Sequence, residues 1–86
     1  MDYLFFDIEC CDGKNICEFG YVIADENLNP LKKDIILVNP DAPFNLGWGK
    51  GPQLYYPFKR YYKSGTFDKH YAEIKRLFDK KDRTVV

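Results

Sequence analysis

Apolar side chains gather in three short runs within the first 38 residues, and polar turn residues separate the runs. The first run, DYLFFDIE at residues 2–9, is compact and rich in aromatic side chains, which favours a buried strand over a helix. The runs at residues 16–24 and 34–38 have the same character, and residues 12–15 and 25–30 between them have the composition of tight turns. Strands joined by such short turns predict an antiparallel meander over residues 1–38.

The chain changes character over residues 39–65, which we interpret as a loop-rich segment. Four prolines and four glycines exclude a long regular element before about residue 57; they are Pro40, Pro43, Pro52, Pro57, Gly47, Gly49, Gly51 and Gly65. A short helix from Pro57 to Tyr62 is expected at the end of the segment, because proline suits the first helical position.

The main helix is predicted within residues 66–81. Thr66 is suited to the N-cap, and Asp68 lies where the helix dipole favours an anion. One apolar stripe repeats at helical spacing and consists of Phe67, Tyr71, Ile74, Leu77 and Phe78. Residues 83–86 then begin a strand that stops abruptly, so we expect residues 1–86 to be the N-terminal portion of a larger α/β domain.

Composition narrows the class of protein. The 86 residues are 45% hydrophobic and 17% aromatic, which is typical of a globular domain rather than a disordered chain. With 13 basic and 13 acidic residues the net charge is zero, which argues against nucleic-acid binding by bulk electrostatics alone. The N-terminus has no signal-peptide pattern and the chain has no apolar run that would span a membrane, so a reducing, cytoplasmic location without a membrane partner is expected.

Two carboxylates on the first strand are the main candidate for chemistry. Side chains alternate across a strand, so Asp7 and Glu9 point to the same face, about 7 Å apart along the backbone. Phe6 and Ile8 point to the other face. The acidic pair is costly in an apolar setting unless a cation lies between the carboxylates, and Mg²⁺ or Mn²⁺ prefers such oxygen ligands. A strand end that rises into solvent would equally accommodate two hydrated acids, and spacing alone does not decide between these readings.

The order of elements around this pair resembles a known family. The chain is similar to the opening of the DEDDh (DnaQ-like, RNase T-like) 3′–5′ exonucleases. The similar segments are, in order, FFDIEC, a hairpin turn, ICEFGYVI, and the helix FDKHYAEIKRLF followed by a Val-Val strand. The first motif of the family, Asp-x-Glu, is matched by Asp7-Ile8-Glu9. The resemblance covers nearly the whole chain but carries only this one catalytic motif.

The resemblance implies the N-terminal part of an RNase H-like domain and hydrolysis of phosphodiester bonds at the 3′ end of DNA or RNA. Asp7 and Glu9 would be catalytic residues and ligands of two Mg²⁺ or Mn²⁺ ions. The later aspartates and the general-base histidine of the family would lie beyond residue 86, so this portion is expected to be inactive, or nearly so, by itself. His70 falls in mid-helix and is predicted to be a surface residue.

Glu18 and the cysteines are secondary candidates. Glu18 is expected to pair across from Asp7 or Ile8, either orienting a metal ligand from behind or simply facing outward. By the resemblance, Cys10 and Cys11 stand where the backbone of the family approaches the terminal nucleotide. A zinc site from the three cysteines and His70 is the competing interpretation, but it lacks a Cys-x-x-Cys spacing, and small apolar fillers are favoured.

A basic and aromatic stretch follows the meander. Lys59 and Arg60 are the candidate phosphate contacts, and they belong to a larger set that comprises Lys50, Lys63, Trp48, Tyr55, Tyr56, Tyr61 and Tyr62. These residues would stack bases and hold phosphates, or the aromatic ones would form the core of a small domain, which is the favoured reading.

Two further expectations concern partners. A small non-enzymatic nucleic-acid-binding or protein-binding module, in which the acidic pair is only surface charge, is the alternative function. A sheet that ends after a partial strand leaves an unpaired edge, so a homodimer formed through that edge, or by exchange of elements between two copies, is expected.

Overall fold

The computed structural model describes residues 1–45 and 56–86 and contains one four-stranded sheet with two helices. The strands are β1 (Asp2–Cys10), β2 (Ile16–Asp25), β3 (Pro30–Leu37) and β4 (Arg83–Val85); the helices are α1 (Phe58–Tyr62) and α2 (Phe67–Asp79). The order across the sheet is β3-β2-β1-β4. β1, β2 and β3 pair antiparallel, whereas β4 pairs parallel with β1. The predicted meander and α/β class are therefore confirmed.

Turn chemistry explains where the meander reverses. Gly13 takes a positive φ of 87° between β1 and β2, and Asp12 accepts hydrogen bonds from the backbone N–H groups of Lys14 and Asn15. Asp25 does the same for Asn27 and Asn29 before β3. β3 begins at Pro30, four residues earlier than the apolar run predicts, because backbone pairing with β2 continues through its charged residues.

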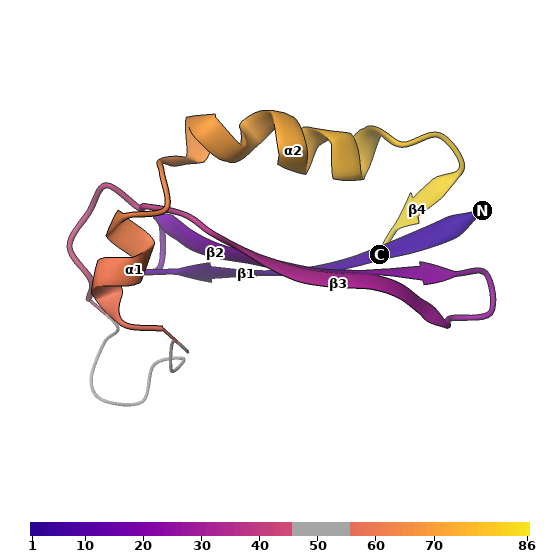
Figure 1. Ribbon diagram of the computed structural model, residues 1–86, viewed down its shortest axis with the longest axis horizontal. Helices are drawn as coiled ribbons and strands as arrows, with labels where there is room; N and C mark the ends of the chain where they lie inside the picture. Colours follow the sequence, from indigo (N-terminus) through magenta and orange to yellow (C-terminus); the bar gives the residue numbers. More distant parts are fainter. Residues whose placement is uncertain (46–55) are drawn as a thin grey trace.

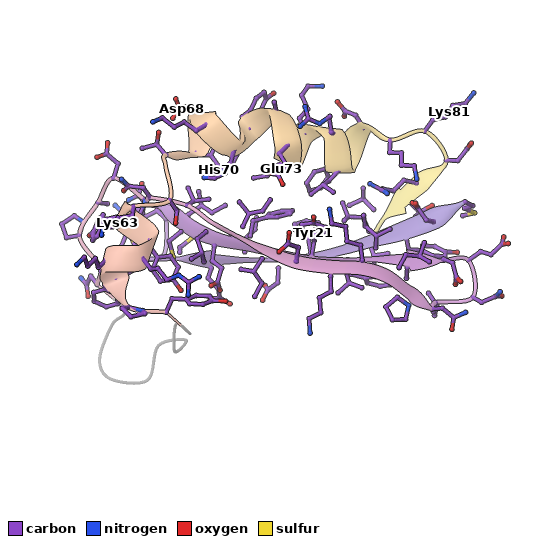
Figure 2. The ribbon with its side chains drawn as sticks, in the orientation of Figure 1. Tyr21, Lys63, Asp68, His70, Glu73 and Lys81 are labelled. Atoms are coloured by element: carbon purple, nitrogen blue, oxygen red, sulfur yellow. The ribbon has the colours of Figure 1, made fainter. Side chains whose placement is uncertain are left out.

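Helix α2 covers one face of the sheet, which we call the helix face (Figure 1). Its apolar stripe places Ile74 in the main core, together with Leu4, Phe19, Tyr21, Ile23, Ile36 and Val38. Phe78 of α2 meets Phe6 of β1 edge-on, with 5.1 Å between ring centroids. Figure 2 shows side chains filling the layer between α2 and the sheet, with Tyr21 pointing into it. The opposite side of the sheet, the open face, carries Asp7 and Glu9.

A second, smaller core lies at the end of the sheet where α1 packs (Figure 1). Cys11, Cys17 and Tyr61 are buried there, with Phe44 and Tyr56 packed against them. Tyr61 is the buried residue of α1. This core fixes α1 beside the carboxyl end of β1, and therefore beside the acidic pair.

The fourth strand is held to the first by an ion-pair network. Arg83 donates from Nε and Nη2 to the two carboxylate oxygens of Asp2, at 2.8 and 3.1 Å, and from Nη1 to the carbonyl of Leu77. Lys80 donates to the same carboxylate at 2.9 Å. These bonds join β1, the last turn of α2 and β4, and they fix the position of the connection between α2 and the sheet.

Two details of α2 differ from expectation. Thr66 is the N-cap, but its hydroxyl bonds the side chain of Asp68 and no cap hydrogen bond to the backbone forms. His70 is half-buried rather than on the solvent side, and its Nε2 lies 2.5 Å from the carbonyl oxygen of Ser64. The reason is that the chain turns into α2 at Gly65, whose φ is 81°, and His70 lies on the side of the helix that faces the sheet (Figure 2).

Candidate acidic site on the open face of the sheet

The open face brings three acidic residues to one end of the sheet. The β1–β2 register pairs Asp7 with Gly20 and Glu9 with Glu18, so these four positions share one face. Sequence reasoning placed Glu18 opposite Asp7 or Ile8, which is wrong by one or two positions. The cause is a register shift between Glu9 and Cys10, where β2 carries one extra residue, Cys17, that the turn residues alone do not reveal.

A shallow groove runs along the open face beside these acids. Its volume is about 360 Å³, and its lining includes Asp7, Glu9 and Glu18 together with Phe5, Val22 and Ile35. Gly20 lies in the floor directly opposite Asp7, and a Cβ atom there would meet only Ile35, at 3.9 Å. The absence of a side chain at Gly20 leaves space above Asp7, so the groove is open at its acidic end.

The two carboxylates of β1 differ in their surroundings. Asp7 is exposed, whereas Glu9 is half-buried. Burial raises the pKa of the Glu9 carboxyl, and the charges of Asp7 and Glu18 and a hydrogen-bond contact with Asp7 raise it further. The folded chain therefore crowds negative charge around Glu9, and a bound cation would relieve this repulsion.

Glu18 is buried, with 5% of its surface exposed, and is not the outward-facing acid that one reading of the sequence favoured. Its Oε1 accepts a hydrogen bond from the hydroxyl of Tyr61 in α1, at 3.1 Å. Burial raises the pKa of the Tyr61 hydroxyl, and the charge of Glu18 adds to this shift, so the tyrosine stays a proton donor. Sequence reasoning missed Tyr61 as a neighbour of the acidic site because 43 residues separate it from Glu18.

The donor set partly fits a divalent cation. Asp7 and Glu9 supply hard oxygen ligands from one face of one strand, as Mg²⁺ or Mn²⁺ requires. Across the residues that the structure describes, however, no three His, Cys, Asp or Glu side chains form a group that could hold a metal ion. The pair therefore offers two protein ligands, and the remaining positions would fall to water, phosphate oxygens or other protein groups.

The cysteines pack as small apolar side chains. Cys11 and Cys17 are fully buried, and their thiols donate to the carbonyls of Pro43 and Glu9. Burial raises the pKa of the Cys17 thiol to about 12. The backbone N–H and carbonyl of Cys11 bond Asn15 and Asn45, so neither of these groups is free to meet a nucleotide in this conformation. Cys10 is half-buried and stands next to the acidic pair.

The basic and aromatic stretch divides between core and surface. Tyr61 is buried, Phe44 stacks on Phe58 at 4.0 Å between centroids, and the Tyr62 hydroxyl donates to the carbonyl of Ala42. Lys59 and Arg60 are exposed on α1, and the Arg60 guanidinium lies 4.5 Å from the centre of the Tyr56 ring. The candidates Trp48, Lys50 and Tyr55 lie outside the described residues.

Comparison with known proteins adds no family assignment. No family model matches the chain, and no curated protein or solved structure is significantly similar to it. Within the described ranges, no helix is long and apolar enough to cross a membrane.

Proposed function

We propose that this chain is the N-terminal part of a metal-dependent 3′–5′ exonuclease domain with an RNase H-like fold, and that it acts on the 3′ end of DNA or RNA. The observation that carries the proposal is the placement of Asp7 and Glu9 on the open face of β1, at the end of a groove whose floor is cleared by Gly20. The order of elements around the pair supports it, since an antiparallel meander is followed by a helix and a strand parallel to β1.

Each residue of the site has a defined task under this proposal. Asp7, the exposed carboxylate, would contact both Mg²⁺ or Mn²⁺ ions, and Glu9 would bind the one beside the attacking water. When bound, the ions would activate that water and stabilise the leaving 3′ oxygen. The apolar side chains of Phe5 and Ile35 would exclude water along the groove, and the exposed Lys59 and Arg60 on α1 would contact phosphates.

Residues 1–86 supply two ligands and no general base under this proposal, so the isolated chain should degrade nucleic acid poorly or not at all. An experiment on the gene tests this directly. If the reading frame continues beyond residue 86, we expect a further aspartate segment and then a His-x-x-x-x-Asp segment. A stop codon after Val86 would instead favour a small binding module, in which the acidic pair is surface charge.

Calorimetric titration with Mn²⁺ tests the metal site on the chain itself. Weak binding is expected for the unaltered protein, and Asp7→Asn should abolish it, because one of the two carboxylate ligands is lost. Asp41→Asn is the matched control, since Asp41 is exposed, lies outside the groove lining and has a positive φ that asparagine tolerates. Equal binding by the Asp7 variant and the control would overturn the metal assignment.

A further inference from the structure

The hydrogen bond between Tyr61 and Glu18 joins α1 to the acidic end of the sheet. Glu18 is the register partner of Glu9 and shares its face, yet its carboxylate is buried and bonded to Tyr61. Tyr61 itself is fully buried among Cys11, Cys17 and other members of the second core. The hydrogen bond therefore connects Glu18, a candidate metal ligand, to the packing of the short helix α1.

This arrangement explains why three acids on one face make only a two-carboxylate site. Glu18 is the register partner of Glu9, and its carboxylate is close enough for its charge to act on Glu9. Nevertheless, no three-ligand group exists in the described part of the chain. The Tyr61 hydroxyl satisfies Glu18 in its buried position, where a carboxylate without such a partner would be strongly disfavoured.

Resting on the proposed function, we propose that Tyr61 is a positioning residue that holds Glu18 away from the Asp7–Glu9 pair, and that losing this hydrogen bond makes Glu18 a third carboxylate ligand of the same divalent cation. Without the hydroxyl, the Glu18 carboxylate turns toward Asp7 and Glu9, where water and a cation satisfy it. The packing of α1 thereby sets the number of protein ligands on the open face.

The test is the Mn²⁺ affinity of Tyr61→Phe, measured by electron paramagnetic resonance of the free ion. This variant keeps the ring and removes only the hydroxyl. We expect binding about tenfold tighter than in the unaltered chain, because a site gains affinity with each added carboxylate. If the tyrosine merely oriented a ligand from behind, the same change would weaken binding by about 10- to 100-fold. Weakened or unchanged binding overturns the inference.

Matched variants separate this effect from a general loosening of α1. Tyr62→Phe removes the neighbouring hydroxyl, which bonds Ala42, and should leave the affinity unchanged. The gain from Tyr61→Phe should vanish when Glu18→Gln is added, because the amide cannot replace the carboxylate. A gain that persists with Glu18→Gln, or that Tyr62→Phe reproduces, contradicts the proposed role of Tyr61.

The outcomes distinguish this inference from the proposed function. If Asp7→Asn abolishes Mn²⁺ binding but Tyr61→Phe brings no gain, the metal assignment stands and the positioning role falls. If neither the unaltered chain nor Tyr61→Phe binds Mn²⁺, both fall. Should Tyr61→Phe not fold, Mg²⁺ titration of the unaltered chain with ¹³C-labelled glutamate gives a second test. The Glu9 side-chain signal should shift clearly more than the Glu18 signal, and comparable shifts at both overturn the inference.

Discussion

At the scale of single residues, the crowding of carboxylates on the open face lowers the stability of the folded chain. Glu9 is half-buried beside two other carboxylates, and its pKa is raised above the ordinary value of 4.5 first by burial and then by those charges. The folded state therefore holds the Glu9 proton to higher pH than the unfolded chain does. This contribution to the free energy of unfolding falls as pH rises through 4.5 and then through the folded-state pKa.

Glu9→Gln should consequently stabilise the metal-free protein at neutral pH. We expect its melting temperature at pH 7 to rise by roughly 2 to 6 °C, and the gain to disappear near pH 3, where Glu9 is protonated in both states. Circular dichroism measures both values. Glu26→Gln, on the exposed turn before β3, is the control and should shift neither. A lower melting temperature for Glu9→Gln at pH 7 would contradict the electrostatic picture of the site.

The sequence pattern predicted the shared face of Asp7 and Glu9 on β1, but not the positions of Glu18 and Tyr61 beside them. Alternation along a strand is a local property, so Asp7 and Glu9 were placed on one face correctly. The partner of Glu18 depends on an irregularity at Glu9 and Cys10, and the role of Tyr61 depends on how a distant helix packs. Neither is encoded in local spacing, which is why sequence reasoning missed both.

At the scale of elements, the contact between β1 and β4 depends on Asp2. The sequence predicted a strand at residues 83–86 but not that Arg83 would bond a carboxylate 81 positions earlier. The Asp2 side chain is 10% exposed and that of Arg83 is 5% exposed. The hydrogen bond from Arg83, aided by that from Lys80, holds the pKa of Asp2 well below its usual range.

Asp2→Asn should therefore destabilise the fold in a pH-dependent way. A depressed pKa gives stability that is fully present above the ordinary value of 3.8 and is lost progressively as pH falls below it. At pH 7 we expect the melting temperature to fall by about 5 °C or more, since Arg83 is left without its charge partner. The difference from the unaltered protein should shrink below pH 3.8.

Asp79→Asn is the matched control for Asp2→Asn. It breaks the ion pair between Lys75 and Asp79, whose side chains are both more than half exposed on α2. Exposed pairs of this kind contribute little, so we expect a shift of less than about 2 °C. Equal shifts in the two variants would mean that the Asp2 network does not hold β4 in place.

At the scale of the whole molecule, the two outer strands of the described sheet differ in how they meet solvent. β3 carries Lys32, Lys33 and Asp34 in the middle of its length, and charged residues discourage pairing with another chain. β4 has the exposed Val85 at its end, with Val86 next to it. We propose that any homodimer forms through β4, by pairing of its edge with that of a second copy.

Sedimentation velocity at increasing protein concentration checks this proposal. The unaltered chain should show a dimer at the higher concentrations, and Val85→Lys should sediment as a monomer throughout, because a lysine on an edge strand opposes edge-to-edge pairing. Leu31→Lys on the β3 side is the control and should leave the dimer intact. A monomer at every concentration, or a dimer that Val85→Lys does not disturb, would rule out association through β4.

More of the overall architecture than of the acidic site could be predicted from the sequence. Apolar runs and turn residues gave the meander and α2, because both depend on short-range periodicity. The location of α1, the burial of Glu18 and the half-burial of His70 depend on packing between segments far apart in the chain. The acidic groove is lined by residues of β1, β2 and β3 alone, so the register of these strands determines which side chains it contains.

The most direct test of the central claim is an NMR titration with Mn²⁺, which broadens the signals of nuclei near the bound ion. If Asp7 and Glu9 hold the cation, the backbone amides of these two residues and of Gly20 should broaden at the lowest Mn²⁺ concentrations, and Asp7→Asn should remove the effect. Broadening that begins instead at the turn acids Asp12 and Asp25, and that persists in Asp7→Asn, would contradict the account.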